Sequence, residues 1–263
     1  MTMLIPFLTI AFLALIQSMT EFLPISSSGH LVLSEKLGFS NQSLATDVAL
    51  HAGTLIAVII YFRRDIFRLC RGFLTNKQDT RMVFNLIIAT VPALLVGFFC
   101  GNIIVRFRTP VIIAVTSIFF GILLWVIDKV VKPRHDIKQM NWAEALCIGA
   151  AQTLALIPGT SRSGITITCC RAFGFNRQDS AKFSMLLSIP VIAAATVYIL
   201  WECWQAHTLN QFVGSQMLIG IGLAALLGLL VIHFLMNWLK HASFAIFAAY
   251  RVFLGVLILY IFF

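Results

Sequence analysis

Apolar runs about as long as a membrane span follow one another along this chain, and they restrict the folds open to it. A transmembrane helix needs about 20 predominantly apolar residues. Six segments of the 263-residue sequence meet this requirement: 44–62, 82–100, 110–128, 183–201, 216–236 and 243–263. Only 11% of the residues are charged, whereas a soluble domain carries about 25%. The sequence therefore predicts an all-α polytopic membrane protein, because the short alternating segments of a β-barrel are not found in it.

Two shorter apolar stretches, 3–19 and 142–157, run directly into polar islands. The first island is Glu21-Phe-Leu-Pro-Ile-Ser-Ser-Ser-Gly-His30, and the second is Pro158-Gly-Thr-Ser-Arg-Ser-Gly-Ile-Thr166. Weakly apolar arms follow each island, at about 27–38 and 163–174. We predict two re-entrant hairpins, 1–43 and 142–174, each turning at its island inside protein, where irregular backbone is tolerated at membrane depth. Ten simple spans with polar surface loops are the alternative.

The basic residues predict which side each connection faces. Segments 63–81, 129–138 and 171–182 hold six, four and three Lys/Arg, and segment 202–215 holds none. The positive-inside rule places the first three in the cytoplasm and the last outside, with both termini outside. The net charge of +9 reflects this bias, so we expect no nucleic-acid partner. The chain would be one membrane domain, 1–263, made of inverted repeats 1–128 and 129–263, each a hairpin plus three spans.

Each island places proline, hydroxyl residues and glycine just before a helical arm, a pattern that predicts two anion-binding helix N-termini. Arg162 lies at bilayer depth, where a charge is rarely left without a partner, and its forked donors suit phosphate oxygens. A structural ion pair with Glu21 is the alternative for Arg162. The substrate-binding residues expected around it are Gln17, Ser26, Ser28, Gly159, Thr160, Ser161, Ser163 and Thr166.

The first island also holds an acid/base pair around a nucleophile. Glu21 and His30 flank Ser27 and Ser26, and a serine hydroxyl attacks only when a neighbouring base takes its proton. His30 attacking phosphorus directly is the alternative. The catalytic residues expected from the sequence are Glu21, Ser27, His30 and Arg162.

Three polar residues within spans have less certain roles. Asp47 and His51 share a helix face at i, i+4 spacing, which suits either the lining of a cavity or a packing hydrogen bond. Arg251 in the last span needs a partner, and we interpret it as structural.

Two motifs resemble those of the undecaprenyl-diphosphate phosphatase family. Gln17-Ser-Met-Thr-Glu21 is similar to its (E/Q)xxxE motif, and Pro158 to Thr166 is similar to its PGxSRSxxT motif. The resemblance implies hydrolysis of undecaprenyl diphosphate to undecaprenyl phosphate and inorganic phosphate, which recycles the lipid carrier of peptidoglycan synthesis. It also implies a bacterial inner-membrane enzyme whose site opens outward, with a polyprenyl diphosphate lipid as partner and a homodimer left open.

The resemblance further implies a divalent cation, Mg²⁺ or Ca²⁺, as cofactor, although no ligand cluster in the sequence identifies a metal site. Gln17 stands where family members also carry glutamate, which leaves Glu21 to supply the carboxylate. The rival function is a transporter or flippase of a phosphorylated lipid, since inverted repeats with broken helices are a transporter design. Membrane phosphatases of the phosphatidic-acid type are set aside, because the chain has no Arg-Pro dipeptide and no HxxxD after the arginine.

Overall fold

The computed structural model describes residues 4–36, 44–205 and 215–263, and this part of the chain consists of helices joined by short irregular connections. Its regular β-structure is limited to one isolated bridge between His135 and Phe175. The predicted all-α class is therefore confirmed. Parts of the predicted hairpin 1–43 (1–3 and 37–43) and of the connection 202–215 (206–214) lie outside the described residues. The α-helices are α1 Leu4–Phe22, α2 Ser27–Lys36, α3 Leu44–Tyr61, α4 Arg63–Gly72, α5 Lys77–Val105, α6 Pro110–Val130, α7 Trp142–Thr153, α8 Arg162–Ala172, α9 Arg177–Gln205, α10 Ser215–Trp238 and α11 Ala245–Phe262.

The long helices coincide with the predicted spans. Within the described residues, five helices are long and apolar enough to cross a membrane, or six if the bent pair of α3 and α4 counts as one span. The two helices of that pair meet at 70°. Segment 63–81, which the sequence suggested only as a basic connection, is largely helical. Asp65 in the first turn of α4 and Arg71 in its last turn complement the helix dipole, which favours this short helix.

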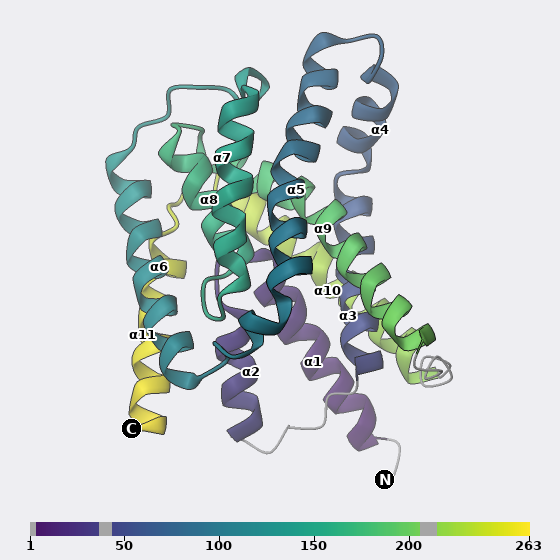
Figure 1. Ribbon diagram of the computed structural model, residues 1–263, viewed down its shortest axis with the longest axis vertical. Helices are drawn as coiled ribbons and strands as arrows, with labels where there is room; N and C mark the ends of the chain where they lie inside the picture. Colours follow the sequence, from purple (N-terminus) through teal and green to yellow (C-terminus); the bar gives the residue numbers. More distant parts are fainter. Residues whose placement is uncertain (1–3, 37–43, 206–214) are drawn as a thin grey trace.

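The two shorter apolar stretches form helical hairpins. In Figure 1, α1 and α2 occupy the lower half of the molecule, α7 and α8 the upper half, and the two connections meet near mid-height. Helix α7 begins with a reciprocal capping box between Asn141 and Glu144, and a short 3-10 helix, Leu154–Leu156, leads from it to the second island. Each island therefore forms the connection of a hairpin.

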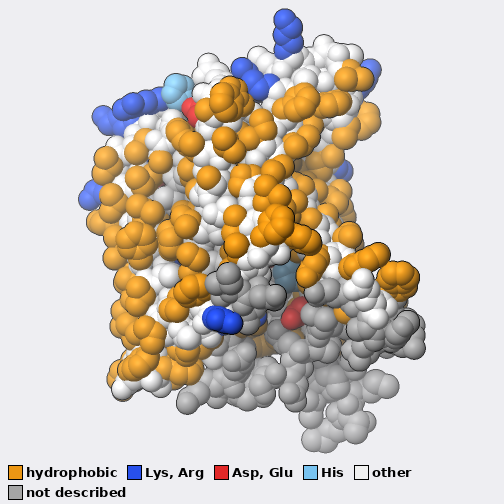
Figure 2. Space-filling view, in the orientation of Figure 1, with side chains coloured by type: hydrophobic (Ala, Val, Ile, Leu, Met, Phe, Trp, Pro, Cys, Tyr) orange, Lys and Arg blue, Asp and Glu red, His pale blue; other side chains and the backbone are white. Residues whose placement is uncertain are grey.

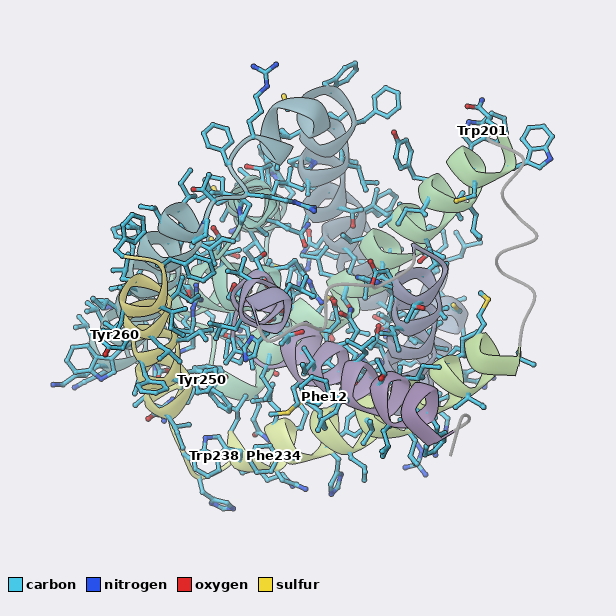
Figure 3. The ribbon with its side chains drawn as sticks, turned by 90° about the horizontal axis from the view of Figure 1, so that it is seen from below. Phe12, Trp201, Phe234, Trp238, Tyr250 and Tyr260 are labelled. Carbon is cyan, nitrogen blue, oxygen red and sulfur yellow. The ribbon has the colours of Figure 1, made fainter. Side chains whose placement is uncertain are left out.

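Small residues let the helices approach closely, as is typical of membrane bundles. A Cβ on Gly149 of α7 would lie 2.6 Å from the Ala89 carbonyl oxygen of α5. A Cβ on Gly53 of α3 would lie 2.5 Å from the Ile221 carbonyl oxygen of α10. Bulky side chains face outward instead: Trp201 and Tyr260 lie at the rim of the molecule seen from below (Figure 3) and are 54% and 84% exposed.

Charge is concentrated at one end of the bundle. Figure 2 shows Lys and Arg side chains gathered at the upper end, above an apolar surface that covers the sides. This end carries α4 and the connection between α6 and α7, while α1 begins and α11 ends at the opposite end (Figure 1). The molecule is thus a multi-pass membrane protein with one basic end.

Candidate active site

The second island forms a tight turn that orients the start of α8. Gly159 has φ +92°, and a Cβ there would overlap the Thr116 side chain, so glycine is required on both counts. Ser161 has φ +68°, which is unusual for a non-glycine residue, and its Oγ accepts from the Gly164 backbone N at 3.2 Å. Ser161 is therefore the N-cap of α8, as the pattern of the island predicted, and Arg162 is the first helical residue.

Arg162 brings the two islands together. Its Nη2 donates to Glu21 Oε1 at 2.7 Å and to the Glu21 carbonyl oxygen at 3.3 Å, and its Nη1 donates to the Ser184 carbonyl oxygen at 2.8 Å. Both the Glu21 and the Arg162 side chains are 15% exposed, so the pair is largely buried but still accessible to solvent. A guanidinium and a carboxylate from separate hairpins thus share one polar centre.

The other Glu21 oxygen faces two further polar groups. Gln17 Nε2 donates to Oε2 at 3.3 Å, one helical turn earlier on α1. His51 Nε2 lies 4.0 Å from the same oxygen, and its Nδ1 donates to the Asp47 carbonyl oxygen at 2.8 Å. That backbone bond fixes the imidazole so that Nε2 faces the carboxylate. The sequence left His51 between a cavity role and a packing role, and the structure places it beside Glu21.

Two of the expected phosphate donors are engaged in hydrogen bonds within the protein. Ser163 Oγ donates to the Leu23 carbonyl oxygen at 2.9 Å and is also 3.3 Å from Ser161 Oγ. Thr166 Oγ1 donates to the Arg162 carbonyl oxygen at 2.9 Å and is 2.7 Å from Ser184 Oγ. Both side chains are buried; the Ser163 hydroxyl stabilises the contact between the islands, and the Thr166 hydroxyl stabilises the packing of α8 against α9.

The serines of the first island lie at the start of α2. Ser26 is buried, and its Oγ accepts from the Gly29 backbone N at 3.4 Å. Ser27 and Ser28 occupy the first turn and are half-buried. No hydrogen bond or ion pair among the described residues joins Ser27, Ser28 or His30 to Glu21 or Arg162. The structure thus brings Glu21 and Arg162 into direct contact, and among the described residues no hydrogen bond connects the α2 serines to that pair.

Both ring nitrogens of His30 are engaged. Nδ1 lies 2.6 Å from the Ser26 carbonyl oxygen and therefore donates, which leaves the lone pair of the neutral ring on Nε2. Nε2 is 2.6 Å from the Tyr250 hydroxyl, and the two rings stack at 5.7 Å. The contact joins α2 to α11, which lie side by side seen from below (Figure 3). The sequence gave no individual role to Tyr250.

Arg251 lies behind the turn of the second island. It is fully buried, and its Nη2 donates to the carbonyl oxygens of Gly159 at 3.0 Å and Thr160 at 2.7 Å. Its Nε and Nη1, and the buried Thr160 Oγ1, have no hydrogen-bond partner among the described residues. A Cβ on Gly164 would lie 2.6 Å from Arg251 Nη1, so glycine makes room for the guanidinium. The partner that Arg251 needed is the backbone of the turn before Arg162.

The described residues contain no group of three or more His, Cys, Asp or Glu side chains that fits a metal ion. Glu21 supplies one carboxylate, and its two oxygens already accept from Arg162 and Gln17. This donor set does not fit a resident Mg²⁺ or Ca²⁺, which prefer several oxygen ligands. The divalent cation stays a prediction, and no step below depends on it.

Comparisons with known proteins agree with the motifs. The family model described as bacitracin resistance protein BacA matches residues 10–257. An undecaprenyl-diphosphatase of Saccharophagus degradans is 44% identical over 93% of this chain and 94% of its own length. Proteins of the same name from Alcanivorax borkumensis and Hahella chejuensis are 43% and 44% identical, each over 94% of this chain and over 96% and 95% of their own lengths. The chain therefore belongs to the bacitracin resistance protein BacA family.

Proposed function

We propose that this protein is an undecaprenyl-diphosphatase, which hydrolyses undecaprenyl diphosphate to undecaprenyl phosphate and inorganic phosphate and so recycles the lipid carrier of peptidoglycan synthesis. The relatives that match nearly the whole chain carry this name. The single structural observation that supports it is the 2.7 Å contact between Arg162 Nη2 and Glu21 Oε1 at the junction of the two hairpins. A cation for phosphate oxygens and a carboxylate for proton transfer are the two groups that this chemistry needs.

Arg162 and the N-terminus of α8 hold the terminal phosphate in this proposal. Arg162 is the first residue of α8, so its guanidinium is attached at the end of the helix where the free amides and the positive end of the helix dipole favour an anion. Arg162 donates to phosphate oxygens from the guanidinium N–H groups that its contacts with Glu21 and Ser184 leave free, and it stabilises the charge that spreads over these oxygens in the transition state. Glu21 and the substrate phosphate then share the guanidinium. Arg251 maintains this geometry from behind, because it holds the Gly159 and Thr160 carbonyls.

Ser27 is the nucleophile that we favour over His30. The His30 lone pair on Nε2 accepts from Tyr250, so a direct attack by His30 on phosphorus would first break that contact. In the proposed step, Ser27 Oγ attacks the terminal phosphorus and its proton passes to the Glu21 carboxylate. The bond to the bridging oxygen breaks, and undecaprenyl phosphate leaves with the electron pair. Glu21 gives its proton to the departing undecaprenyl phosphate. Water then attacks the phosphoserine and passes one proton to Glu21, and Glu21 returns this proton to Ser27 Oγ as the Oγ–P bond breaks, which releases inorganic phosphate and restores the Ser27 hydroxyl.

The topology proposed is an inverted repeat, 1–128 and 129–263, whose re-entrant hairpins enter from opposite faces of the bacterial inner membrane. Helix α1 has 19 residues and α7 has 12, and each leads to a polar island, which supports the re-entrant arrangement. The basic end would be cytoplasmic by the positive-inside rule, so the start of α1 and the end of α11 would lie outside. The site would then open outward, and a homodimer stays a prediction.

The transporter alternative makes a different prediction for protein in detergent micelles, where there is no second compartment. Purified protein mixed with undecaprenyl diphosphate should release inorganic phosphate in step with undecaprenyl phosphate. A transporter would bind the lipid and leave it intact. Phosphate release is measured colorimetrically and the lipid product by chromatography. Arg162→Ala protein, purified in the same way, is the control for a contaminating phosphatase, because a contaminant would remain active in that preparation.

A further inference from the structure

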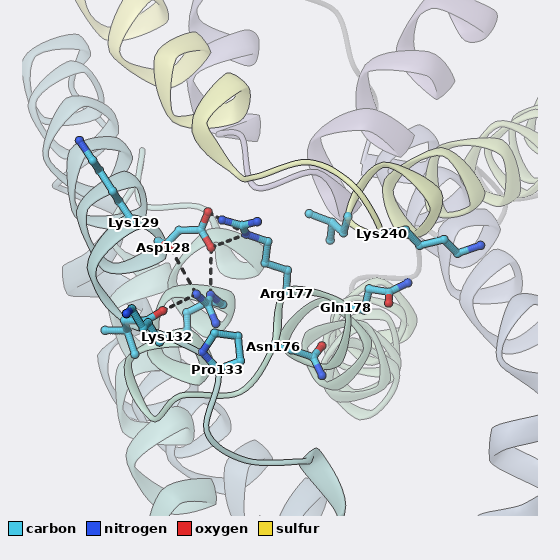
Figure 4. A pocket seen from close by; sticks show the side chains of 11 residues that line it. Asp128, Lys129, Lys132, Pro133, Asn176, Arg177, Gln178 and Lys240 are labelled. Carbon is cyan, nitrogen blue, oxygen red and sulfur yellow. Dashed lines mark hydrogen bonds and ion pairs between the residues drawn. The ribbon is translucent and has the colours of Figure 1, made fainter.

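The basic end of the bundle contains a cavity that the proposed reaction does not use. It is open to the surface and has a volume of about 390 Å³, at the place where α6 and α10 end and α9 begins. The charged residues that line it are Asp128, Lys129, Lys132, Arg171, Arg177 and Lys240 (Figure 4). Ligand pockets of about 300–1,000 Å³ are typical of small-molecule sites, so the volume suits a small polar group.

The one carboxylate in this lining is already neutralised. Asp128 is 3% exposed at its side chain and accepts from Arg171 Nε at 2.9 Å, from Arg177 Nε at 2.9 Å and from the Phe244 backbone N at 3.1 Å. Figure 4 shows the contact of Asp128 with Arg177 within the lining. Five basic residues against one acidic residue leave a formal charge of +4 around the cavity. The lining is therefore strongly positive.

The start of α9 adds backbone N–H groups to the lining, and the carboxylate of its first turn, Asp179, accepts from Ile137 N and Asn176 Nδ2. Asn176 caps this 29-residue helix, because its Oδ1 accepts from the Asp179 backbone N at 2.8 Å. Arg177 and Gln178, the first two helical residues, line the cavity, and amides in a first turn have no partner within their helix. The Arg177 side chain remains 35% exposed while its Nε binds Asp128. The Arg177 guanidinium, the first turn of α9 and the lysines of the lining therefore all face the same cavity.

Tryptophans at this end set its level in the membrane. Lys129 Nζ lies 5.0 Å from the centre of the Trp125 ring, on the last turns of α6. Trp238 ends α10, directly before Leu239 and Lys240 of the cavity wall. Tryptophan is enriched at the membrane–water interface, and basic pockets between helices there bind lipid headgroups. The position of these tryptophans supports a location of the cavity at the level of lipid phosphates.

We propose that this cavity is a second anion site, distinct from the Glu21–Arg162 centre, which binds the phosphate group of an anionic membrane lipid. Arg177 and the start of α9 form its floor, and the flexible side chains of Lys132 and Lys240 close over the phosphate from the rim. Helix α8 runs between the two sites. It begins at Arg162, and Arg171 lies in its last turn, about 14 Å further along the helix axis.

Lipid binding to the purified protein tests this proposal without a measurement of phosphatase activity. Protein in micelles is titrated with phosphatidylglycerol, with zwitterionic phosphatidylcholine, and with inorganic phosphate, and bound ligand is counted by native mass spectrometry. The cavity variant is Lys132→Gln with Lys240→Gln. Its matched control is Lys77→Gln with Lys138→Gln, which removes two exposed lysines at the basic end that do not line the cavity.

The proposal expects phosphatidylglycerol to bind the wild type more tightly than phosphatidylcholine does. The cavity variant should bind it about 10-fold more weakly, and the control variant less than about twofold more weakly, at the same ionic strength. If inorganic phosphate competes with the lipid and its binding also depends on Lys132 and Lys240, the anion site is supported and it binds free phosphate as well as the lipid phosphate. Equal weakening in both variants, or no preference for phosphatidylglycerol, would overturn the proposal.

Discussion

Arg162 Nη2 donates to Glu21 Oε1 at 2.7 Å, although 141 positions separate the two residues along the chain. The contact joins the start of α8 to the end of α1 and is reinforced by the Ser163 hydroxyl, which donates to the Leu23 carbonyl oxygen. Two helical hairpins are thus joined at their polar turns, in a bundle that is otherwise apolar. The predictions below follow from that junction.

Glu21→Gln should abolish most turnover while the protein still folds. The glutamine oxygen can still accept from Arg162, but an amide cannot take a proton from the nucleophile. We expect kcat for phosphate release to fall at least about 100-fold. Gln17→Ala, which removes a 3.3 Å contact to the same carboxylate, should lower kcat less than about 10-fold. Glu21→Gln protein that keeps more than about a tenth of wild-type kcat would remove Glu21 from the mechanism.

Ser27→Ala and Ser28→Ala form a matched pair on the first turn of α2, where both side chains are half-buried. Loss of the nucleophile should reduce kcat at least about 100-fold in Ser27→Ala. Ser28→Ala should lose less than about 10-fold, since one neutral hydrogen bond to substrate is removed at most. Brief reaction with phosphate-labelled substrate, followed by acid quench and peptide mapping, should find label on Ser27. Label on His30 would reverse the choice between the two nucleophiles.

Tyr250→Phe tests the role of His30 independently. The substitution removes the hydroxyl 2.6 Å from His30 Nε2 and keeps the stacked ring. If His30 positions α2 against α11, turnover should fall by no more than about 10-fold, the value of one hydrogen bond. If instead His30 attacks phosphorus, removal of Tyr250 frees its lone pair and turnover should rise, or its pH dependence should shift. The pH–rate profiles of wild type and variant separate these two cases.

Arg251 should prove to be a positioning residue for Arg162. Arg251→Ala leaves the Gly159 and Thr160 carbonyls without their buried donor, which costs about 1–3 kcal/mol for each unsatisfied group. We expect a lower unfolding temperature and a reduced kcat. Arg251→Lys can still donate to one or both carbonyls, so it should recover part of kcat. A lysine variant as impaired as the alanine variant would show that the forked guanidinium itself is needed.

The helices were largely predictable from the sequence because each apolar run had to cross or enter the membrane. Residues 110–128 and 216–236 correspond closely to α6 and α10. The helical connection of α4 and its 70° bend from α3 were missed, since its basic residues favour helix through dipole and surface contacts rather than apolar length. The inverted repeat and the membrane orientation stay predictions.

The candidate site was predictable in part. Glu21 and Arg162 could be paired from sequence, because a guanidinium at bilayer depth requires a nearby anion or substrate. Contacts that depend on tertiary packing were not predictable. His51 reaches Glu21 from α3, and Arg251 reaches the turn of the second island from α11, 91 or 92 positions away. Neither the spacing of residues along the chain nor the residue type specifies to which backbone oxygens a buried arginine donates.

Phosphate release by Arg162→Ala protein in detergent micelles tests the central claim most directly. Arg64→Ala is the matched control, since Arg64 is an exposed arginine at the start of α4. With undecaprenyl diphosphate as substrate, Arg162→Ala should lose at least about 100-fold in kcat/KM, while Arg64→Ala stays within about twofold of wild type. Wild-type phosphate release from folded Arg162→Ala protein would contradict the assignment of this centre to diphosphate hydrolysis.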